Sequence, residues 1–441
     1  GENPRRVQLT PVGADTTTPA AGLASRVFER LDARLEFHVE RPVVLALSGG
    51  GDSMALLDLA ALWAARRGRR LLAVTVDHGL SPASGRWNAI AAQAAAAVGA
   101  EWRGIRWDGP RPSTGLPAAA RAARHALIAD VARAAGARVM LFAHTSSDVA
   151  EADWMRARGS SLGRIRAWAP SPAWPQGRGL MLLRPLLPES RERVRTYLAE
   201  RGLGWVEDPG NVDPRYARSR ARQDLAAAGA IPVAPPLPRT IRGPAPRVSP
   251  IGVIQLSRAA SARTLAKAAV CAGGGSRPPR SERLTRLLVR LAAGEDFTVA
   301  MCGARIEAVG PRVTLMREAG EFVRFPPTPQ VVTTGGRLVW DGRFELTALA
   351  GGTRVVAAAG RLAQLSPEDR QRLARLPAAV RPTLPVLIRE GSDAPVLAGR
   401  AGDARCLVGE RLALALDETP HESGLGDALH GAKPPDPLFS V

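Results

Sequence analysis

The sequence predicts an α/β protein built on a doubly wound parallel sheet and followed by two smaller C-terminal domains. Three observations support this prediction. Between residues 41 and 158, short apolar runs alternate with alanine-rich stretches of helical periodicity, which is typical of strand–helix–strand units and a parallel sheet. The first apolar run ends in three consecutive glycines. Two proline-rich breaks then divide the rest of the chain.

The elements of the first domain follow from this alternation. The expected strands are 43–47, 71–76, 102–106 and 139–143, and the expected helices are 53–66, 85–98, 117–135 and 148–158. Right-handed crossovers would place helices on both faces of the sheet, and ligands of such sheets bind beyond the carboxyl ends of the strands. Ser48, Asp77 and His144 each follow a strand. We therefore expect these three side chains at one edge of the sheet.

The chain after residue 158 changes in composition several times. Residues 159–188 are rich in Gly, Pro, Arg and Trp and are expected to be irregular, whereas 190–201 has helical periodicity with Ser190 as N-cap. Seven of the twenty residues from 231 to 250 are proline, which marks a linker. The expected divisions are a disordered N-terminal extension (1–22), the α/β domain (23–225), a Pro-rich linker (226–250), a helical basic domain (251–325) and a small α+β domain (331–441). In the last two divisions, helical stretches are expected at 256–293 and near 366–375, and strands at 297–301, 312–316 and 343–347.

Charge and cysteine content limit the functional classes. The formal net charge of +19 favours a polyanionic partner, although arginine and alanine enrichment across a whole proteome would produce the same bias. The three cysteines are far apart and form no C-x-x-C pair, so neither a zinc site nor an iron–sulfur cluster is indicated. The sequence contains no apolar run of membrane-spanning length and no signal peptide pattern. We expect a cytoplasmic protein that does not associate with membranes.

Residues 43–53, VVLALSGGGDS, place a glycine-rich loop between a buried strand and a helix. Gly49, Gly50 and Gly51 allow successive backbone N–H groups to converge on an anion, and the helix adds its positive N-terminal end. The loop is therefore expected to bind phosphate. Taken alone, a triple glycine favours a simple strand-to-helix turn, and only the segments downstream favour the phosphate site.

The chemistry of this loop differs from that of the common nucleotide loop G-x-x-x-x-G-K-[ST]. The only lysines are Lys267 and Lys433, both far from it. Phosphate charge would instead be met by backbone N–H groups, the hydroxyls of Ser48 and Ser53, arginine, and a magnesium ion held with help from Asp52.

A series of short segments follows this loop in a characteristic order. They are Val76-Asp77-His78-Gly79-Leu80, Ala143-His144, Trp205-Val206-Glu207-Asp208-Pro209, Asn211, Asp213-Pro214 and Arg218-Ser219-Arg220-Ala221-Arg222. With the Ser48–Ser53 loop, the series resembles the tRNA(Ile)-lysidine synthetases, which are ATP pyrophosphatases of the PP-loop family. The resemblance implies an adenine nucleotide alpha hydrolase-like fold for the first domain.

The resemblance also implies a two-step ligation. The C2 oxygen of the wobble cytidine attacks the α-phosphate of ATP and pyrophosphate leaves; the amine of free lysine then attacks C2 and expels AMP. The implied cofactors are ATP and Mg²⁺, and the implied partners are tRNA(Ile) and free lysine. A homodimer is compatible with the sequence.

The resemblance assigns roles to individual residues. The residues expected to bind ATP are Ser48, Gly49, Gly50, Gly51, Asp52, Ser53, Asp77, His78 and His144, with Asp52 also the metal ligand. The residues expected to be catalytic are Asp52, Arg124, Asp148 and Glu151. The residues expected to bind tRNA are Arg158, Arg215, Arg218, Arg220 and Arg222.

The acids Asp148 and Glu151 are expected to hold and deprotonate lysine. Their i, i+3 spacing at a helix start places both on one face, where the helix dipole favours an anion. Each role has a structural alternative: the two acids as capping residues, Arg124 as exposed decoration of an alanine-rich helix, and the arginines after 214 as a solvated helical face.

The match departs from the family pattern at five positions: Ser147, Val149, Ala152, Ser161 and Ser219. The central acids survive, so the chemistry is retained while the hydrogen bonding around it is altered. Two other hypotheses stay open. One is a catalytically weakened paralogue that binds tRNA or nucleotide; the other is a tRNA 2-thiolation enzyme with the same loop, against which the lack of paired cysteines argues.

Overall fold

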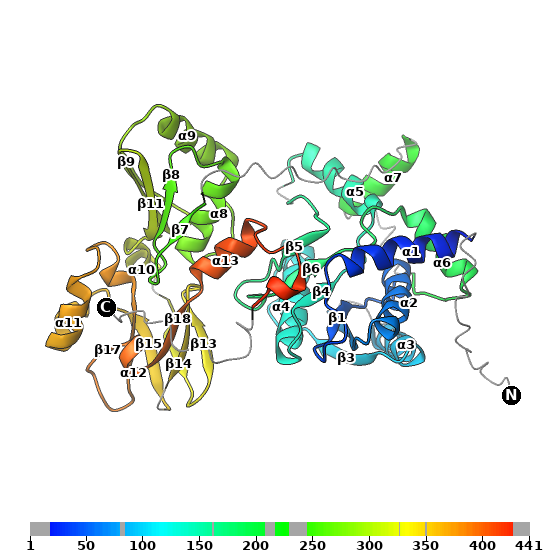
Figure 1. Ribbon diagram of the computed structural model, residues 1–441, viewed down its shortest axis with the longest axis horizontal. Coiled ribbons are helices and arrows are strands. Elements are labelled where there is room, and N and C mark those ends of the chain that lie inside the picture. Colours follow the sequence, from blue (N-terminus) through cyan, green and yellow to red (C-terminus); the bar gives the residue numbers. More distant parts are fainter. Residues whose placement is uncertain are drawn as a thin grey trace. The chain divides into compact units, whose positions relative to one another are not determined.

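The computed structural model describes residues 18–79, 84–160, 163–207, 217–228, 245–325, 327–348 and 351–426. The chain divides into two compact units (Figure 1). Unit 1 comprises residues 1–238 with 419–429, and unit 2 comprises 239–418 with 430–441. None of the helices in the described ranges is both long enough and apolar enough to span a bilayer.

Unit 1 is built on a six-stranded sheet with the order β3-β2-β1-β4-β6-β5. The strands are β1 (Val43–Ala46), β2 (Leu71–Asp77), β3 (Glu101–Arg106), β4 (Val139–Leu141), β5 (Trp168–Pro170) and β6 (Met181–Leu183). All neighbouring strands are parallel except β5, which pairs antiparallel with β6 at the edge. The four strands expected from the sequence are present. The chain order reverses at β1, as in a doubly wound sheet.

The helices of unit 1 also follow the expected alternation. They are α1 (Pro19–Asp32), α2 (Gly51–Arg66), α3 (Ser84–Ala97), α4 (Leu116–Ala134), α5 (Ser146–Ala157), α6 (Arg191–Glu200) and α7 (Ala217–Ala227). Ser190 caps α6 as expected, because its hydroxyl accepts a hydrogen bond from the Arg193 N–H at 3.2 Å.

Two expectations for unit 1 need correction. Residues 18–22, expected in a disordered extension, begin α1: the Thr18 hydroxyl accepts from the Ala21 N–H at 3.2 Å, and Pro19 suits the first turn. Residues 1–17 lie outside the described ranges. The segment 159–188, expected to be irregular, contributes β5 and β6, whose three residues each are too short to show a hydrophobic period.

The core of unit 1 fixes the helices against the sheet. Alternate side chains of the central strands, including Val44, Leu72 and Met140, pack against Ile128 and Ala129 of α4. On α2, the buried Asp58 accepts hydrogen bonds from the Tyr197 hydroxyl and from Arg201 Nε of α6, the latter at 3.0 Å. This contact fixes α6, whose N-terminus lies at the functional edge.

A short C-terminal segment, 419–426, belongs to unit 1. Glu422 is fully buried and pairs with the equally buried Arg69, with Nη1–Oε2 at 2.8 Å and Nη2–Oε1 at 3.1 Å. The Glu422 N–H also donates to the Arg34 carbonyl at 2.8 Å, and Trp168 Nε1 donates to the Thr419 carbonyl at 2.8 Å. These residues, expected within the small C-terminal domain, are thus bonded to the first one.

Unit 2 begins with a five-stranded antiparallel sheet of order β7-β8-β11-β10-β9. Its elements are β7 (Arg247–Val248), β8 (Ile254–Ser257), α8 (Ala262–Gly273), α9 (Ser281–Ala292), β9 (Phe297–Met301), β10 (Ala304–Val309) and β11 (Arg312–Arg317). The region 251–325, expected to be a helical domain, is therefore a sheet packed with two helices, and β7 lies within the expected linker. The expected strands 297–301 and 312–316 are present as β9 and β11. The strands that the sequence did not predict are β7, β8 and β10, which are two, four and six residues long.

The rest of unit 2 contains two smaller antiparallel sheets, β12-β15-β16-β17 and β13-β14-β18. The elements are α10 (Gly320–Arg324), β12 (Gln330–Val332), β13 (Arg337–Trp340), β14 (Phe344–Ala348), β15 (Thr353–Ala357), α11 (Pro367–Ala374), β16 (Pro385–Ile388), β17 (Val396–Leu397), α12 (Ala398–Ala401), β18 (Gly402–Cys406) and α13 (Val408–Ala415). The expected strand 343–347 and helix 366–375 correspond to β14 and α11.

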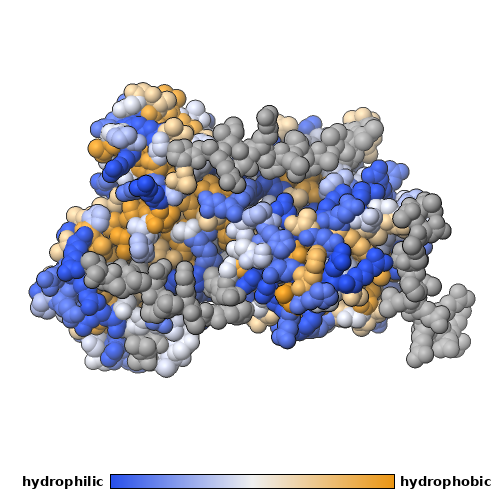
Figure 2. Space-filling model, viewed as in Figure 1, coloured by the Kyte–Doolittle hydropathy of each residue, from blue (hydrophilic) through white to orange (hydrophobic). Residues whose placement is uncertain are grey.

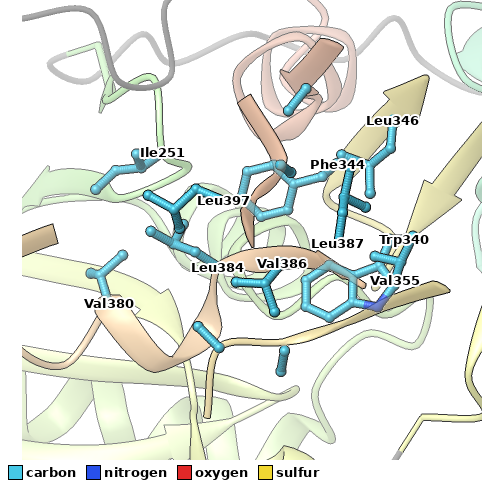
Figure 3. Packing of buried hydrophobic residues seen from close by; sticks show 14 of the residues in the cluster. Ile251, Trp340, Phe344, Leu346, Val355, Val380, Leu384, Val386, Leu387 and Leu397 are labelled. Atoms are coloured by element: carbon cyan, nitrogen blue, oxygen red, sulfur yellow. The ribbon is translucent and has the colours of Figure 1, made fainter. Parts of the chain in front are cut away.

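A shared core joins the sheets of unit 2. Figure 3 shows Trp340 and Phe344 close to Val355 and Val386, and the same cluster includes Met316 of the five-stranded sheet. Burial of this apolar surface is the main stabilising term for the unit. Figure 2 shows that hydrophilic residues cover much of the visible face of unit 1, with smaller hydrophobic areas between them.

Candidate active site

The glycine-rich loop joins the carboxyl end of β1 to the N-terminus of α2. Gly49 has φ of +81°, which favours glycine, and its carbonyl accepts from the Val206 N–H at 2.9 Å. Gly50 is the N-cap of α2, and no side chain caps this helix. The first turn of α2 therefore presents backbone N–H groups and the positive end of the helix dipole to a ligand.

Two serines hold this loop in shape. The Ser53 hydroxyl donates to the Gly50 carbonyl at 2.8 Å and accepts from the Ser48 N–H at 3.2 Å, and the two hydroxyls lie 3.1 Å apart. The loop is thus closed by its own side chains.

Three acids meet beside the loop through one arginine. Arg191, the first residue of α6, contacts Asp52 of α2 (Nε–Oδ2 3.5 Å), Asp148 of α5 (Nη2–Oδ1 3.8 Å) and Glu151 of α5 (Nη1–Oε1 3.1 Å). Burial alone would lower the pKa of Arg191, but the three acids raise it above its usual value. The sequence prediction brought the three acids to one edge; it did not include Arg191.

The two acids of α5 have different surroundings. Asp148 Oδ2 accepts from the Thr145 N–H at 2.9 Å, so this residue does cap the helix, while its Oδ1 faces Arg191 and Arg218. Glu151 makes no such cap. It is 1% exposed, and its Oε1 accepts from Arg222 Nε at 2.7 Å. One carboxylate oxygen of Asp148 therefore caps the helix, as the structural alternative expects, whereas Glu151 does not cap it.

Two carboxylate oxygens at this junction are buried without a hydrogen-bond partner among the described residues: Asp52 Oδ1 and Glu151 Oε2. Burial raises the pKa of Asp52, and the neighbouring Asp148 adds to the effect. An unsatisfied buried carboxylate oxygen is costly, so each atom is suited to accept a cationic ligand.

The carboxylate oxygens beside the loop can be compared with the ligands that Mg²⁺ requires. Mg²⁺ binds one or two carboxylate oxygens together with water and phosphate oxygens, which fits the unpartnered Asp52 Oδ1 beside a phosphate-binding loop. In the described ranges no group of three or more His, Cys, Asp or Glu side chains could hold a metal by itself. A nucleotide would have to supply further ligands.

Two further arginines, Arg121 and Arg124 of α4, interact electrostatically with Asp148. Burial, reinforced by Arg121 and Arg218, lowers the pKa of Arg124 to about 10, and burial with the charge of Arg218 also lowers the pKa of Arg121. Arg124 Nε is buried and has no hydrogen-bond partner in the described chain. Like charges that depress one another's pKa values are stabilised by a bound anion. This placement favours a functional role for Arg124 over exposed decoration.

The two histidines expected at this edge, His78 and His144, both have lowered pKa values. His144 is 7% exposed and accepts from Arg184 Nε through its Nδ1 at 3.1 Å, and burial with the charge of Arg184 holds its pKa well below the usual range. Burial and the charge of Arg124 lower the pKa of His78. Asp77 accepts from the Gly79 N–H at 2.7 Å and from the Ser84 hydroxyl at 3.2 Å, so it shapes the loop after β2.

The residues expected to bind tRNA do not form a single basic face. α7 packs against α5 (Figure 1), and it turns Arg218 and Arg222 toward Asp148 and Glu151. Arg220 of the same helix is exposed, and Arg158 stacks on the Trp154 ring with Cζ 3.6 Å from the centroid. Arg215 lies outside the described residues. Of the described arginines expected to bind tRNA, Arg158 and Arg220 are thus exposed, whereas Arg218 and Arg222 pair with the acids.

The sequence prediction missed two arginines of α6, Arg191 and Arg195. The guanidinium of Arg195 lies over Gly51. Ser190 as N-cap signalled the start of α6, and Arg191 is the residue that follows it. A basic residue at the start of a helix next to the functional edge was the sequence feature that could have predicted Arg191 as a site residue.

Fold and site together define the PP-loop class of ATP-using enzymes. Residues 23–228 match the PP-loop domain family. The chain is 47% identical over 368 residues to the tRNA(Ile)-lysidine synthase of Caulobacter vibrioides, covering 83% of this chain and 88% of that protein. It is 36% identical over 339 residues to the tRNA(Ile)-lysidine synthase of Hyphomonas neptunium, covering 71% and 91%. The chain therefore belongs to the tRNA(Ile)-lysidine synthase family.

Among solved structures the chain is similar to the U34-tRNA thiolase of Methanococcus maripaludis, with 18% identity and a TM-score of 0.40 over 48% of this chain and 75% of that one.

Proposed function

We propose that this chain ligates free lysine to C2 of the wobble cytidine of tRNA(Ile), using ATP and releasing AMP and pyrophosphate. Family membership supports the reaction. Two observations support the site. Arg191 contacts the carboxylates of Asp52, Asp148 and Glu151, and two buried carboxylate oxygens beside the loop have no hydrogen-bond partner among the described residues.

In the first step the C2 oxygen of cytidine forms a bond to the α-phosphate, and the bond between the α- and β-phosphates breaks. The loop N–H groups and the Ser48 hydroxyl would hold the phosphates in line, with Arg124 balancing their charge. Mg²⁺ would be held by Asp52 and the phosphates, and when bound it neutralises phosphate charge. The residues thus position the reactants and need not form a covalent bond to them.

In the second step a lysine nitrogen bonds to C2, and the C2–O bond breaks as AMP leaves. The attacking amine must lose a proton. Glu151 Oε2, buried and unpartnered, would accept it, while Asp148 Oδ1 would hold lysine through its charge. Arg218 forms an ion pair with Asp148 and Arg222 with Glu151. A bound lysine would therefore share or replace these ion pairs.

The tRNA would contact the exposed arginines around α5 and α7, namely Arg158 and Arg220, and Arg215 is proposed with them on sequence alone. All groups invoked come from one chain, so the proposed reaction does not require a homodimer. We place the reaction in the cytoplasm, where tRNA and ATP are both available.

Transfer of labelled lysine to a tRNA(Ile) transcript with ATP tests the proposal directly. We expect incorporation that requires ATP and that disappears when the wobble cytidine is replaced by uridine. Binding of tRNA or ATP with neither pyrophosphate release nor lysine incorporation would instead support the weakened paralogue. Sulfur incorporation into tRNA would support the thiolation enzyme. Retention of the three central acids in contact with Arg191 favours an active ligase over both.

A further inference from the structure

The guanidinium of Arg195 lies directly over the first turn of α2. A Cβ atom placed on Gly51 would be 2.1 Å from Arg195 Nη1 and 2.6 Å from its Cζ. Any side chain at position 51 would therefore collide with the guanidinium. This explains the third glycine of the loop, whose φ is not in the left-handed region: it leaves space for an arginine from α6.

The segment after α6 holds this guanidinium in place. The Trp205 ring stacks against it, with Arg195 Cζ 4.4 Å from the ring centroid, and Glu207 Oε1 lies 3.6 Å from Nη2. Trp205 Nε1 also donates to Glu207 Oε1 at 2.9 Å. Between these two residues, Val206 bonds the segment to Gly49. Residues 205–207 thus fix both the loop and the arginine above it.

One nitrogen of the guanidinium lacks a hydrogen-bond acceptor among the described residues. Arg195 Nη1 is buried and has no hydrogen-bond partner among the residues that the structure describes. Its partner Glu207 is 78% exposed, so that ion pair is weak and screened. A buried charged donor without an acceptor is costly, and here it sits at the N-terminus of α2, where the helix dipole also favours an anion.

We propose that Arg195 binds the phosphate chain of ATP, and the pyrophosphate that leaves from it, above the loop 48–53. This inference rests on the proposed function, because it takes the loop as the ATP site. The loop contains no lysine, so an arginine from α6 supplies the fixed cation that the loop sequence lacks. Arg191 and Arg195, one turn apart on α6, then have separate tasks: Arg191 orients the acids, and Arg195 meets the phosphates.

The test measures binding of inorganic pyrophosphate and of AMP, each with Mg²⁺, by calorimetry on the full chain. Arg195→Met should weaken pyrophosphate binding by about ten- to a hundredfold, the usual effect of losing a charge-assisted contact, and leave AMP binding unchanged. Arg195→Lys should recover part of the loss. The matched control is Arg193→Met on the same helix, whose side chain is 63% exposed and pairs with Glu189; it should bind pyrophosphate as the unmodified chain does.

A second variant keeps the test decisive if Arg195→Met does not fold. Gly51→Ala places a methyl group where the guanidinium lies, so it should weaken pyrophosphate binding in the unmodified chain and have a smaller effect beside Arg195→Lys. Additive losses, equal weakening of pyrophosphate and AMP, or unchanged pyrophosphate binding would each overturn the assignment. A chain that shows the expected pyrophosphate binding but transfers no lysine would refute the proposed function and leave this inference intact.

Discussion

Replacement of Glu151 by glutamine separates the two half-reactions. The amide keeps the size of the side chain and an oxygen that can accept from Arg191 and Arg222, which lie 3.1 and 2.7 Å from Oε1. It cannot accept a proton at the buried, unpartnered position of Oε2, nor neutralise an ammonium group. We therefore expect Glu151→Gln to form adenylated tRNA(Ile) and to stall before lysine transfer.

The size of the effect follows from the contacts. Loss of one charge-assisted contact to lysine costs about 1.5 to 3 kcal/mol, or roughly ten- to a hundredfold in the lysine-dependent step. The fold should survive the change, because Arg191 keeps Asp52 and Asp148, and the Arg222 side chain is 28% exposed and reaches water. The melting temperature should stay close to that of the unmodified chain.

The assay is a single turnover with labelled ATP and tRNA(Ile), in which adenylated tRNA is followed with and without lysine. The matched control is Asp153→Asn, an exposed acid on the same helix that pairs with Arg156. It should leave both steps unchanged. Equal loss of adenylation and lysine transfer in Glu151→Gln would move Glu151 into the ATP site, and loss of neither would remove it from the chemistry.

Three further predictions test other parts of unit 1. Asp52→Asn should abolish ATP-dependent pyrophosphate release yet raise the melting temperature at neutral pH, because burial raises the pKa of Asp52 and its ionised form destabilises the folded chain; a folded variant with normal release would refute the role. Arg220→Ala should lower the slope of log tRNA affinity against log salt by about one unit, and overlapping binding curves would exclude a phosphate contact. Burial alone would raise the pKa of Glu189, but hydrogen bonds from Arg26 and Arg30 lower it to about 2 from 4.5. Its stabilising contribution is therefore present above about pH 4.5 and lost as pH falls toward 2, and acid unfolding of Glu189→Gln should be less steep across that window, whereas an unchanged profile would contradict the pairing.

Local pattern was sufficient to predict the sheet and its functional edge. Strand and helix periods are properties of neighbouring residues, and the rule that parallel strands end at one edge then places Ser48, Asp77 and His144 together. Short elements escaped this reasoning. β5 and β6 span only three residues each, and β7 and β8 only two and four, whereas the longer strands β9 and β11 were predicted.

The pairing of charges was decided by the tertiary structure alone. Composition shows an excess of arginine, and spacing shows which arginines share a helix face, but neither shows which carboxylate each one meets. Arg222 reaches Glu151 across 71 positions, and Arg69 meets Glu422 across 353. Such contacts depend on how whole elements pack, since electrostatic pairing acts through distance in space, whereas the periodicity that predicts helices and strands acts along the chain.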